Sequence, residues 1–244
     1  MKITHGSLFT GIGGFDLAAE WAGFRNVFAC EINKFCREII KQNFNQKKIY
    51  EDIRKQDFKA YRGKIDIISG GFPCQDISVA GRMEGIEQYT RSGLFYELIR
   101  VIEEIQPRIA IFENVPQVRN YEDVPAYFKW TGYRLAMFDV QANWWGYPHR
   151  RKRTIGIAAN AVRYGLQEFH YFVAMCEKIM QSQRCAIQAN NPLLPLWTSE
   201  YDKFIQLDYG VSNKVASIQA LGNAVIPIIP YTFFEILKET LLKK

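Results

Sequence analysis

The chain has 244 residues, of which 48% are hydrophobic and 23% charged, with a net charge of +6 and five cysteines. These proportions are typical of a globular protein and exclude wholesale disorder and fibrous repeats. No run approaches the ~18 uncharged apolar residues of a membrane span, and the first residues lack the apolar core of a signal peptide. The cysteines are odd in number and irregularly spaced, which fits neither a disulfide framework nor a paired zinc site. We therefore expect a reduced, cytoplasmic protein without membrane association.

The excess of positive charge lies in the first two-thirds of the chain. Residues 1–159 carry 23 basic and 18 acidic side chains, whereas residues 160–215 carry five of each. The densest point is the run Arg-Arg-Lys-Arg at residues 150–153. Such a run is usually a solvated surface, and it indicates a nucleic-acid contact only when other features support one.

Short β-rich runs alternate with helical patterns over the first 160 residues. The expected strands span residues 3–10, 26–32, 65–69, 108–112, 133–140 and 153–158. The expected helices span residues 15–22, 34–44 and 92–105. This alternation predicts an α/β fold, a mostly parallel sheet with helices on both faces, whose ligands bind at the carboxyl ends of the strands.

The alternation stops near residue 160. Residues 169–180 have the pattern of one helix, but residues 181–199 are polar, contain two prolines and show no clear period. A final helix is expected at residues 227–242, after a Gly-Asn turn. The last third therefore predicts an irregular region followed by one closing helix.

Three expected strand ends carry residues suited to an adenosyl cofactor. The loop at residues 9–14 reads Phe-Thr-Gly-Ile-Gly-Gly, and its glycines would let the backbone approach a ligand closely. It is no dinucleotide fingerprint, and alone a purely structural turn is as good an interpretation. Glu31 follows the second strand, where an acid can bind ribose hydroxyls, and Asp52 lies where a third strand would end. Together the three favour a cofactor site.

Two further strand ends carry a thiol and a carboxyl group. Cys74 lies in the Gly-Gly-Phe-Pro-Cys-Gln loop at residues 70–75, and Glu113 lies in Phe-Glu-Asn-Val at residues 112–115. A lone cysteine is usually a small buried hydrophobe, but one in a loop shaped by glycine and proline is better placed to be a nucleophile. Neighbouring strand ends that offer Cys and Glu predict one shared site.

In their order along the chain, these motifs resemble the DNA (cytosine-5)-methyltransferase family. The matching blocks are residues 9–15, Glu31, and residues 65–75, 92–107, 113–115, 146–153 and 220–227. The resemblance implies a Rossmann-like fold dependent on S-adenosylmethionine, with a small target-recognition insertion. It divides the chain into a catalytic and cofactor-binding core at 1–159, a recognition region at 160–215 and a C-terminal segment at 216–244 that returns to the core.

The resemblance also implies the reaction. A methyl group passes from S-adenosylmethionine to carbon 5 of a cytosine flipped out of a specific double-stranded DNA sequence, and S-adenosylhomocysteine is the product. No metal ion takes part. We expect a monomer encoded by a bacterium or a phage, with a restriction endonuclease as a possible functional partner.

By the same resemblance, Cys74 attacks C6 of the ring, Glu113 binds N3 and the exocyclic amine, and Arg153 contacts O2. Arg151 orders the site and the phosphate backbone. The implied cofactor contacts are Phe9, Gly11, Gly13, Gly14, Glu31, Ile32, Asp52, Ile53 and Asn223. The implied contacts to the flipped base are Phe72, Pro73, Gln75 and Ser78.

The chain departs from the family pattern in two places. His149 stands where the family usually has Gln, and the arginine-containing block before the last motif is not evident. Recognition would then rest on fewer than 60 residues, so we expect a short target sequence. Two alternatives stay open, the same chemistry on a tRNA cytosine and a catalytically inactive DNA-binding homologue. A nicotinamide oxidoreductase would explain the first glycine loop but leaves the Cys and Glu loops unexplained.

Overall fold

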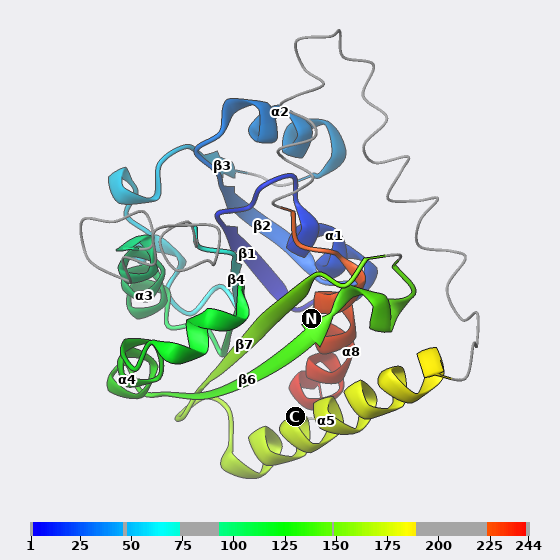
Figure 1. Ribbon diagram of the computed structural model, residues 1–244. Helices are drawn as coiled ribbons and strands as arrows, with labels where there is room; N and C mark the ends of the chain where they lie inside the picture. The colour runs from blue at the N-terminus through cyan, green and yellow to red at the C-terminus, as the bar shows by residue number, and fades with distance from the viewer. Residues whose placement is uncertain (1, 46–47, 74–92, 148, 189–223, 243–244) are drawn as a thin grey trace, which may run out of the picture.

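The fold is an α/β sandwich around one seven-stranded sheet (Figure 1). The computed structural model describes residues 2–45, 48–73, 93–147, 149–188 and 224–242, of which 184–188 in backbone only. The strands are β1 (Thr4–Leu8), β2 (Arg25–Cys30), β3 (Lys48–Tyr50), β4 (Ile67–Gly70), β5 (Ile109–Asn114), β6 (Tyr133–Gln141) and β7 (Lys152–Asn160). They lie in the order β3-β2-β1-β4-β5-β7-β6.

Only β7 runs against the direction of the other strands. The pairs from β3 through β5 are all parallel. Strand β7 pairs antiparallel with both β5 and β6. The prediction of a mostly parallel sheet is therefore confirmed.

Helices cover both faces of the sheet, as the alternation predicted. They are α1 (Gly14–Trp21), α2 (Lys34–Asn43), α3 (Leu94–Ile105), α4 (Asp123–Trp130), α5 (Leu166–Gln188) and α8 (Ile228–Leu242). Short 3₁₀ turns are η1 (Ile53–Lys55), η2 (Lys59–Tyr61), η4 (Pro116–Asn120) and η5 (Ala142–Trp145). One hydrophobic core joins the sheet to α1, α5 and α8, and a second joins its other face to α3 and α4.

The inner strand β1 is fully buried although three of its five residues are polar. Its His5 side chain makes two hydrogen bonds across the sheet, from Nδ1 to Asn26 Oδ1 (2.6 Å) and from Nε2 to Ser69 Oγ (2.8 Å). Burial lowers the pKa of His5 to about 4. The imidazole is therefore neutral at physiological pH, and both of its nitrogens have hydrogen-bond partners inside the core.

Helix α8 brings the end of the chain back to its beginning. Its Phe234 ring packs at 5.3 Å from Phe24 and 6.4 Å from Phe15, between ring centroids. Figure 1 shows α8 beside α1 and α5 on one side of the sheet. The segment before α8 reaches the first loop, because a methyl group added at Gly14 would lie only 2.3 Å from the carbonyl oxygen of Val225.

Candidate active site

The loop from β1 to α1 has a conformation that favours glycine. Phe9, Gly11 and Gly13 all have positive φ angles, of 50°, 58° and 94°. Gly13 caps the N-terminus of α1, and a side chain there would also collide with the Phe44 ring, 2.2 Å from its β-carbon. The loop therefore carries no side chain at its two glycines, and the open space beside Gly11 at the carboxyl end of β1 lets a ligand approach the backbone.

Two hydroxyl groups that the sequence patterns did not single out hold this loop in place. Thr10 donates its N–H to the Cys30 carbonyl (3.2 Å), and its Oγ1 accepts the Cys30 N–H (3.2 Å). Ser7 Oγ donates to the buried carboxylate of Asp16 at the start of α1 (2.9 Å). The loop is thereby tied to the end of β2, where Glu31 follows.

The Glu31 carboxylate is locked in position next to the glycine loop. Its Oε2 accepts the N–H of Gly11 (2.7 Å), and its Oε1 accepts the N–H of Asn33 (2.8 Å). Each oxygen keeps further acceptor capacity, so the group can receive the two adjacent hydroxyls of a ribose. Ile32 beside it is 62% exposed and offers an apolar surface to a flat ring.

The third predicted cofactor turn follows β3. Asp52 caps η1 by accepting the Arg54 N–H (3.1 Å), and its Oδ2 lies 2.8 Å from the Arg54 guanidinium. The hydrogen bonds from Arg54 lower the pKa of Asp52. Ile53 is buried beneath it. Because β1, β2 and β3 are parallel, the structure brings the glycine loop, Glu31 and Asp52 to one edge of the sheet.

Four predicted site residues, Cys74, Gln75, Ser78 and Asn223, lie outside the described residues. The path toward Cys74 is described as far as Pro73, which is half-buried. The Phe72 ring packs between Phe95 and Phe112, and its carbonyl accepts a hydrogen bond from Asn114 Nδ2 (3.2 Å). The asparagine of the Glu-Asn-Val motif thus anchors the start of the Cys74 loop.

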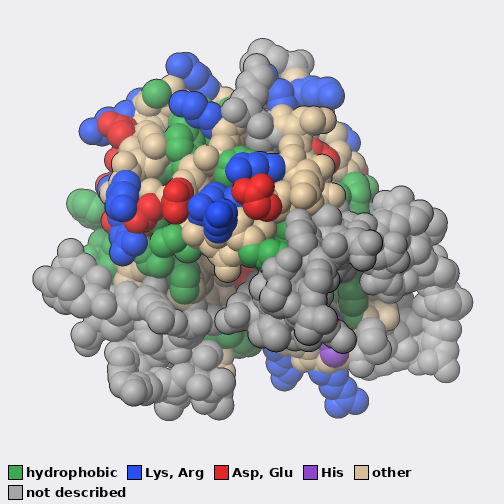
Figure 2. Space-filling model, turned by 90° about the horizontal axis from the view of Figure 1, so that it is seen from above, with side chains coloured by type: hydrophobic (Ala, Val, Ile, Leu, Met, Phe, Trp, Pro, Cys, Tyr) green, Lys and Arg blue, Asp and Glu red, His purple; other side chains and the backbone are tan. Residues whose placement is uncertain are grey.

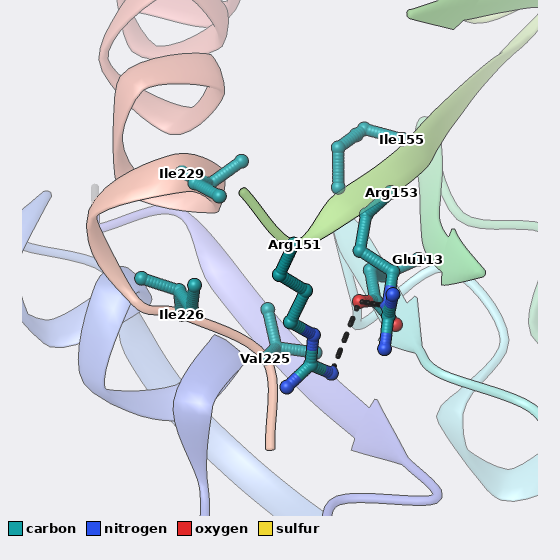
Figure 3. A pocket seen from close by; sticks show the side chains of 7 residues that line it. All are labelled: Glu113, Arg151, Arg153, Ile155, Val225, Ile226 and Ile229. Carbon is teal, nitrogen blue, oxygen red and sulfur yellow. Dashed lines mark ion pairs between the residues drawn. The ribbon is translucent and has the colours of Figure 1, made fainter. Parts of the chain in front are cut away.

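Glu113 and two arginines meet in a pocket at the same edge of the sheet (Figure 3). Glu113 Oε1 lies 2.8 Å from Arg153 Nε and 3.7 Å from Arg151 Nη2. The remaining lining residues are Ile155, Val225, Ile226 and Ile229. The pocket is thus lined by three charged side chains and by apolar side chains from β7, from the segment before α8 and from the first turn of α8.

The reversed direction of β7 brings these charges together. Glu113 is near the end of β5, and in an all-parallel sheet the beginning of the next strand would lie at the opposite edge. Because β7 is antiparallel to β5, its beginning lies beside the end of β5, with Glu113 opposite Ile155. Side chains two residues apart share a face, which places Arg153 on the side of Glu113.

Burial and two nearby cations act on the ionisation of the Glu113 carboxyl group in opposite directions. Burial raises the pKa of Glu113, and the nearby Arg153 and Arg151 charges oppose that rise. A raised pKa lets a carboxyl group keep a proton at higher pH, so it can donate to a ring nitrogen while its other oxygen accepts from an amine. A β-carbon on Gly71 would lie 3.7 Å from Glu113 Oε2, so the loop leading to Cys74 starts at the pocket wall.

The loop between β6 and β7 is closed by the Ala142 N–H, which donates to the Arg151 carbonyl (3.0 Å). His149 is exposed, with its ring 5.8 Å from that of Tyr147, and does not line the Glu113 pocket.

Figure 2 shows Lys and Arg side chains next to Asp and Glu near the middle of the face seen from above. The described part of this face therefore carries both signs of charge.

The described residues offer neither a metal-binding cluster nor a membrane-spanning helix. They include no group of three or more His, Cys, Asp or Glu side chains that could hold a metal ion. No helix among them is long and apolar enough to cross a membrane.

The chain is similar to known proteins in its match to a family model, in its sequence and in its fold. The family model described as "C-5 cytosine-specific DNA methylase" matches residues 3–188. The chain is 34% identical over 165 residues to the type II methyltransferase M.PspPI of Psychrobacter, which covers 64% of this chain and 39% of that protein. It is 39% identical over 153 residues to M.FnuDI of Fusobacterium nucleatum, which covers 60% of this chain and 44% of that protein.

A solved structure shares the fold at low sequence identity. The Dnmt2 methyltransferase of S. pombe superposes with a TM-score of 0.54 at 20% identity, covering 67% of this chain and 52% of that one. The chain thus spans less than half the length of the two curated relatives above and about half of this structure.

Proposed function

The chain belongs to the C-5 cytosine-specific DNA methylase family, and from this premise we propose that it methylates carbon 5 of cytosine in a specific double-stranded DNA sequence, with S-adenosylmethionine as the methyl donor. The observation that carries the proposal is the buried Glu113 carboxyl group, 2.8 Å from Arg153, beside the strand end that leads to Cys74. A carboxyl group, a cation and a loop that carries a thiol are the three elements that this chemistry needs around one base.

In the proposed reaction, Cys74 activates a carbon that is by itself a poor nucleophile. The Cys74 thiolate forms a bond to C6, which breaks the aromatic system and makes C5 enamine-like. Glu113 donates to N3 and accepts from the exocyclic amine, so that negative charge does not build up on the ring. Once C5 has taken up the methyl group, loss of the C5 proton to a base and expulsion of the Cys74 thiolate restore the ring. A stacked base is out of reach, so the cytosine is flipped out of the duplex.

The arginines complete the base pocket. Arg153, on the face of the sheet that carries Glu113, is the donor we assign to O2 of the base. Arg151, at the mouth of the same pocket, is assigned to ordering the site and to the phosphate backbone. Phe72 and Pro73, with Gln75 and Ser78 beyond them, are assigned to the walls around the flipped base.

The residues of the cofactor edge fit S-adenosylmethionine. When bound, the cofactor supplies an electrophilic methyl group. Glu31 offers two fixed acceptor oxygens for the ribose, Ile32 offers an exposed apolar side chain for the adenine, and Asp52 offers an acceptor for the adenine amine. Gly11 leaves room for the methionine end, because no atom lies within 4 Å of a β-carbon added there, and Gly13 and Asn223 are assigned to the same end.

We assign target recognition to residues 160–215. Within that region α5 packs against α8 and η5, so its described part is built onto the core. The region is short, and we propose a correspondingly short target sequence. We further propose a cytoplasmic monomer of bacterial or phage origin, with a restriction endonuclease as a possible functional partner.

The test is bisulfite sequencing of DNA and of tRNA from cells that express the chain or its Cys74→Ala variant. We expect methylated cytosines at one short DNA sequence with the unaltered chain and none with Cys74→Ala. Cys176→Ala, which removes a thiol buried in the hydrophobic core beneath α5, should keep the methylation. Methylation of tRNA alone would support the RNA alternative, and DNA binding without methylation would support the inactive homologue.

A further inference from the structure

We propose that Arg100 is a positioning residue for the adenine end of the cofactor site. The inference rests on the proposed function, because it assigns Arg100 to holding the turn that carries Asp52 and Ile53. Arg100 lies on α3, which is distant in sequence from that turn, and it is not among the cofactor contacts that the sequence resemblance implied.

The guanidinium group of Arg100 binds the turn through its backbone. Its Nη2 donates to the carbonyl of Ile53 (2.7 Å), and its Nη1 donates to the carbonyl of Gln56 (3.3 Å). These two carbonyls belong to the first residue of η1 and to the residue that ends it. One planar group therefore fixes both ends of the turn.

Two carboxylates on the same helix hold Arg100 in this orientation. Glu97 Oε2 accepts from Nε (2.9 Å) and Nη2 (2.7 Å), and Glu104 Oε1 accepts from Nη1 (2.7 Å). All three guanidinium nitrogens are therefore engaged, and a planar fork bound on both sides keeps a single orientation. Glu104 also accepts the N–H of Phe58 (2.8 Å), so α3 holds the segment after Asp52 at a further point.

The turn needs this support because it follows a weak part of the sheet. Strand β3 has only three residues and lies at the edge, so it pairs with β2 alone. The glycine loop and Glu31 follow the longer strands β1 and β2, which have partners on both sides. A hydrogen bond from the adenine amine to Asp52 weakens steeply when its geometry shifts, so the position of η1 should set the affinity for adenine.

Arg62 provides a matched control. It also donates to main-chain carbonyls, those of Glu103 (2.8 Å) and Glu104 (3.0 Å), and is contributed by the segment just after η2. These carbonyls lie at the C-terminal end of α3 and not in η1. Replacing Arg62 therefore removes the same kind of contact without touching the turn that carries Asp52.

The experiment measures binding of two ligands by calorimetry to the unaltered chain, Arg100→Lys and Arg62→Lys. The ligands are S-adenosylhomocysteine and its inosine analogue, in which hypoxanthine replaces adenine and the amine is lost. A lysine keeps the charge but cannot bind two carbonyls and two carboxylates at once. We expect Arg100→Lys to weaken S-adenosylhomocysteine binding about tenfold and the inosine analogue far less. The KM for S-adenosylmethionine should rise while kcat stays near its original value.

The outcomes separate this inference from the proposed function. Equal affinities in Arg100→Lys and Arg62→Lys would overturn the role of Arg100. An equal loss for both ligands, together with a lower Tm, would show a general structural role and would also overturn it. If the unaltered chain binds neither ligand, the proposed function fails and the inference fails with it.

Discussion

The two halves of the sheet build their parts of the site in different ways. In the all-parallel half, β3-β2-β1-β4, only strand ends reach the site, and they contribute tight turns, backbone N–H groups and two fixed carboxylates. In the other half the reversed β7 adds the beginning of a strand to the same edge, which brings Arg151 and Arg153 beside Glu113. The comparison shows that one antiparallel strand lets a sheet edge combine side-chain charges that a purely parallel sheet would separate.

The halves meet at the segment before α8. Val225 lies against Gly14 of the cofactor loop, and its side chain also lines the Glu113 pocket. A β-carbon on Gly71 would lie 3.9 Å from Val225 Cγ2. A change in either half can therefore reach the other through Val225, and the following predictions test how far the halves act separately.

The largest effect is expected from Glu113→Gln in the charged half. Gln keeps the shape but cannot supply a proton to N3, so kcat for methylation should fall by about 10²–10⁴. The affinity for S-adenosylhomocysteine should stay unchanged, because the cofactor turns belong to the parallel half. A tritiated-methyl transfer assay and calorimetry measure the two quantities.

Glu122→Gln is the matched control, because it makes the same exchange at an exposed carboxyl group of the segment between η4 and α4. It should leave kcat unchanged. Comparable loss of cofactor affinity and kcat in Glu113→Gln would contradict the separation of the two halves.

Gly14→Ala should affect both halves at once. The added methyl group would overlap the Val225 carbonyl oxygen at 2.3 Å, so the segment before α8 must move. We expect a loss of about 1–3 kcal/mol in the free energy of unfolding, with weaker cofactor binding and lower kcat, measured by urea unfolding and by the assays above.

Gly11→Ala provides the comparison within the same loop. Its φ angle of 58° is strained for alanine, but no atom lies within 4 Å of the new β-carbon. It should cost about 1–2 kcal/mol of stability and leave kcat at saturating cofactor nearly intact. If Gly11→Ala lowers kcat as much as Gly14→Ala, contact with Val225 is not what couples the halves.

The last effect concerns pH, and the two halves should respond with opposite signs. The folded-state pKa of His5 is about 4, below the unfolded value of about 6.5, so the unfolded chain binds more protons between these values. The stabilising contribution of neutral His5 is complete above pH 6.5 and is lost as the pH falls toward 4. The loss should reach about 2 kcal/mol at pH 5.

His5→Gln isolates that contribution. The fall in unfolding free energy between pH 8 and pH 5 should be about 2 kcal/mol smaller in the variant than in the unaltered chain. Glu113, whose pKa is raised, acts in the opposite direction because the folded state takes up its proton more readily as the pH falls. Identical pH profiles for the two proteins would refute a buried neutral His5.

Much of the fold could be predicted because its signals are local. The apolar run at residues 108–112 is the buried strand β5, and the glycines at 11 and 13 have the positive φ angles that their loop position suggested. The expected helix at 169–180 is longer, Leu166–Gln188. Helix α4 was not expected, since Pro125 interrupts its pattern, although proline is compatible with a first helical turn.

The parts that escaped prediction depend on contacts between distant residues. Nothing in the apolar run of β7 reveals its direction, yet that direction brings Arg153 to Glu113. The polar strand β1 is buried because Asn26 and Ser69 satisfy His5 from neighbouring strands. The contacts from Arg100 to Ile53 join segments almost fifty residues apart, which no local pattern can indicate.

The most direct test of the proposed chemistry is a covalent trap. A target duplex with 5-fluorocytosine at the methylated position carries fluorine where the proton must leave, so the bond from Cys74 to C6 cannot be released after methyl transfer. We predict a denaturation-resistant protein–DNA adduct that requires S-adenosylmethionine, maps to Cys74 in peptide mass spectra and is absent in Cys74→Ala. Normal turnover on ordinary DNA without any adduct on the fluorinated duplex would contradict the account.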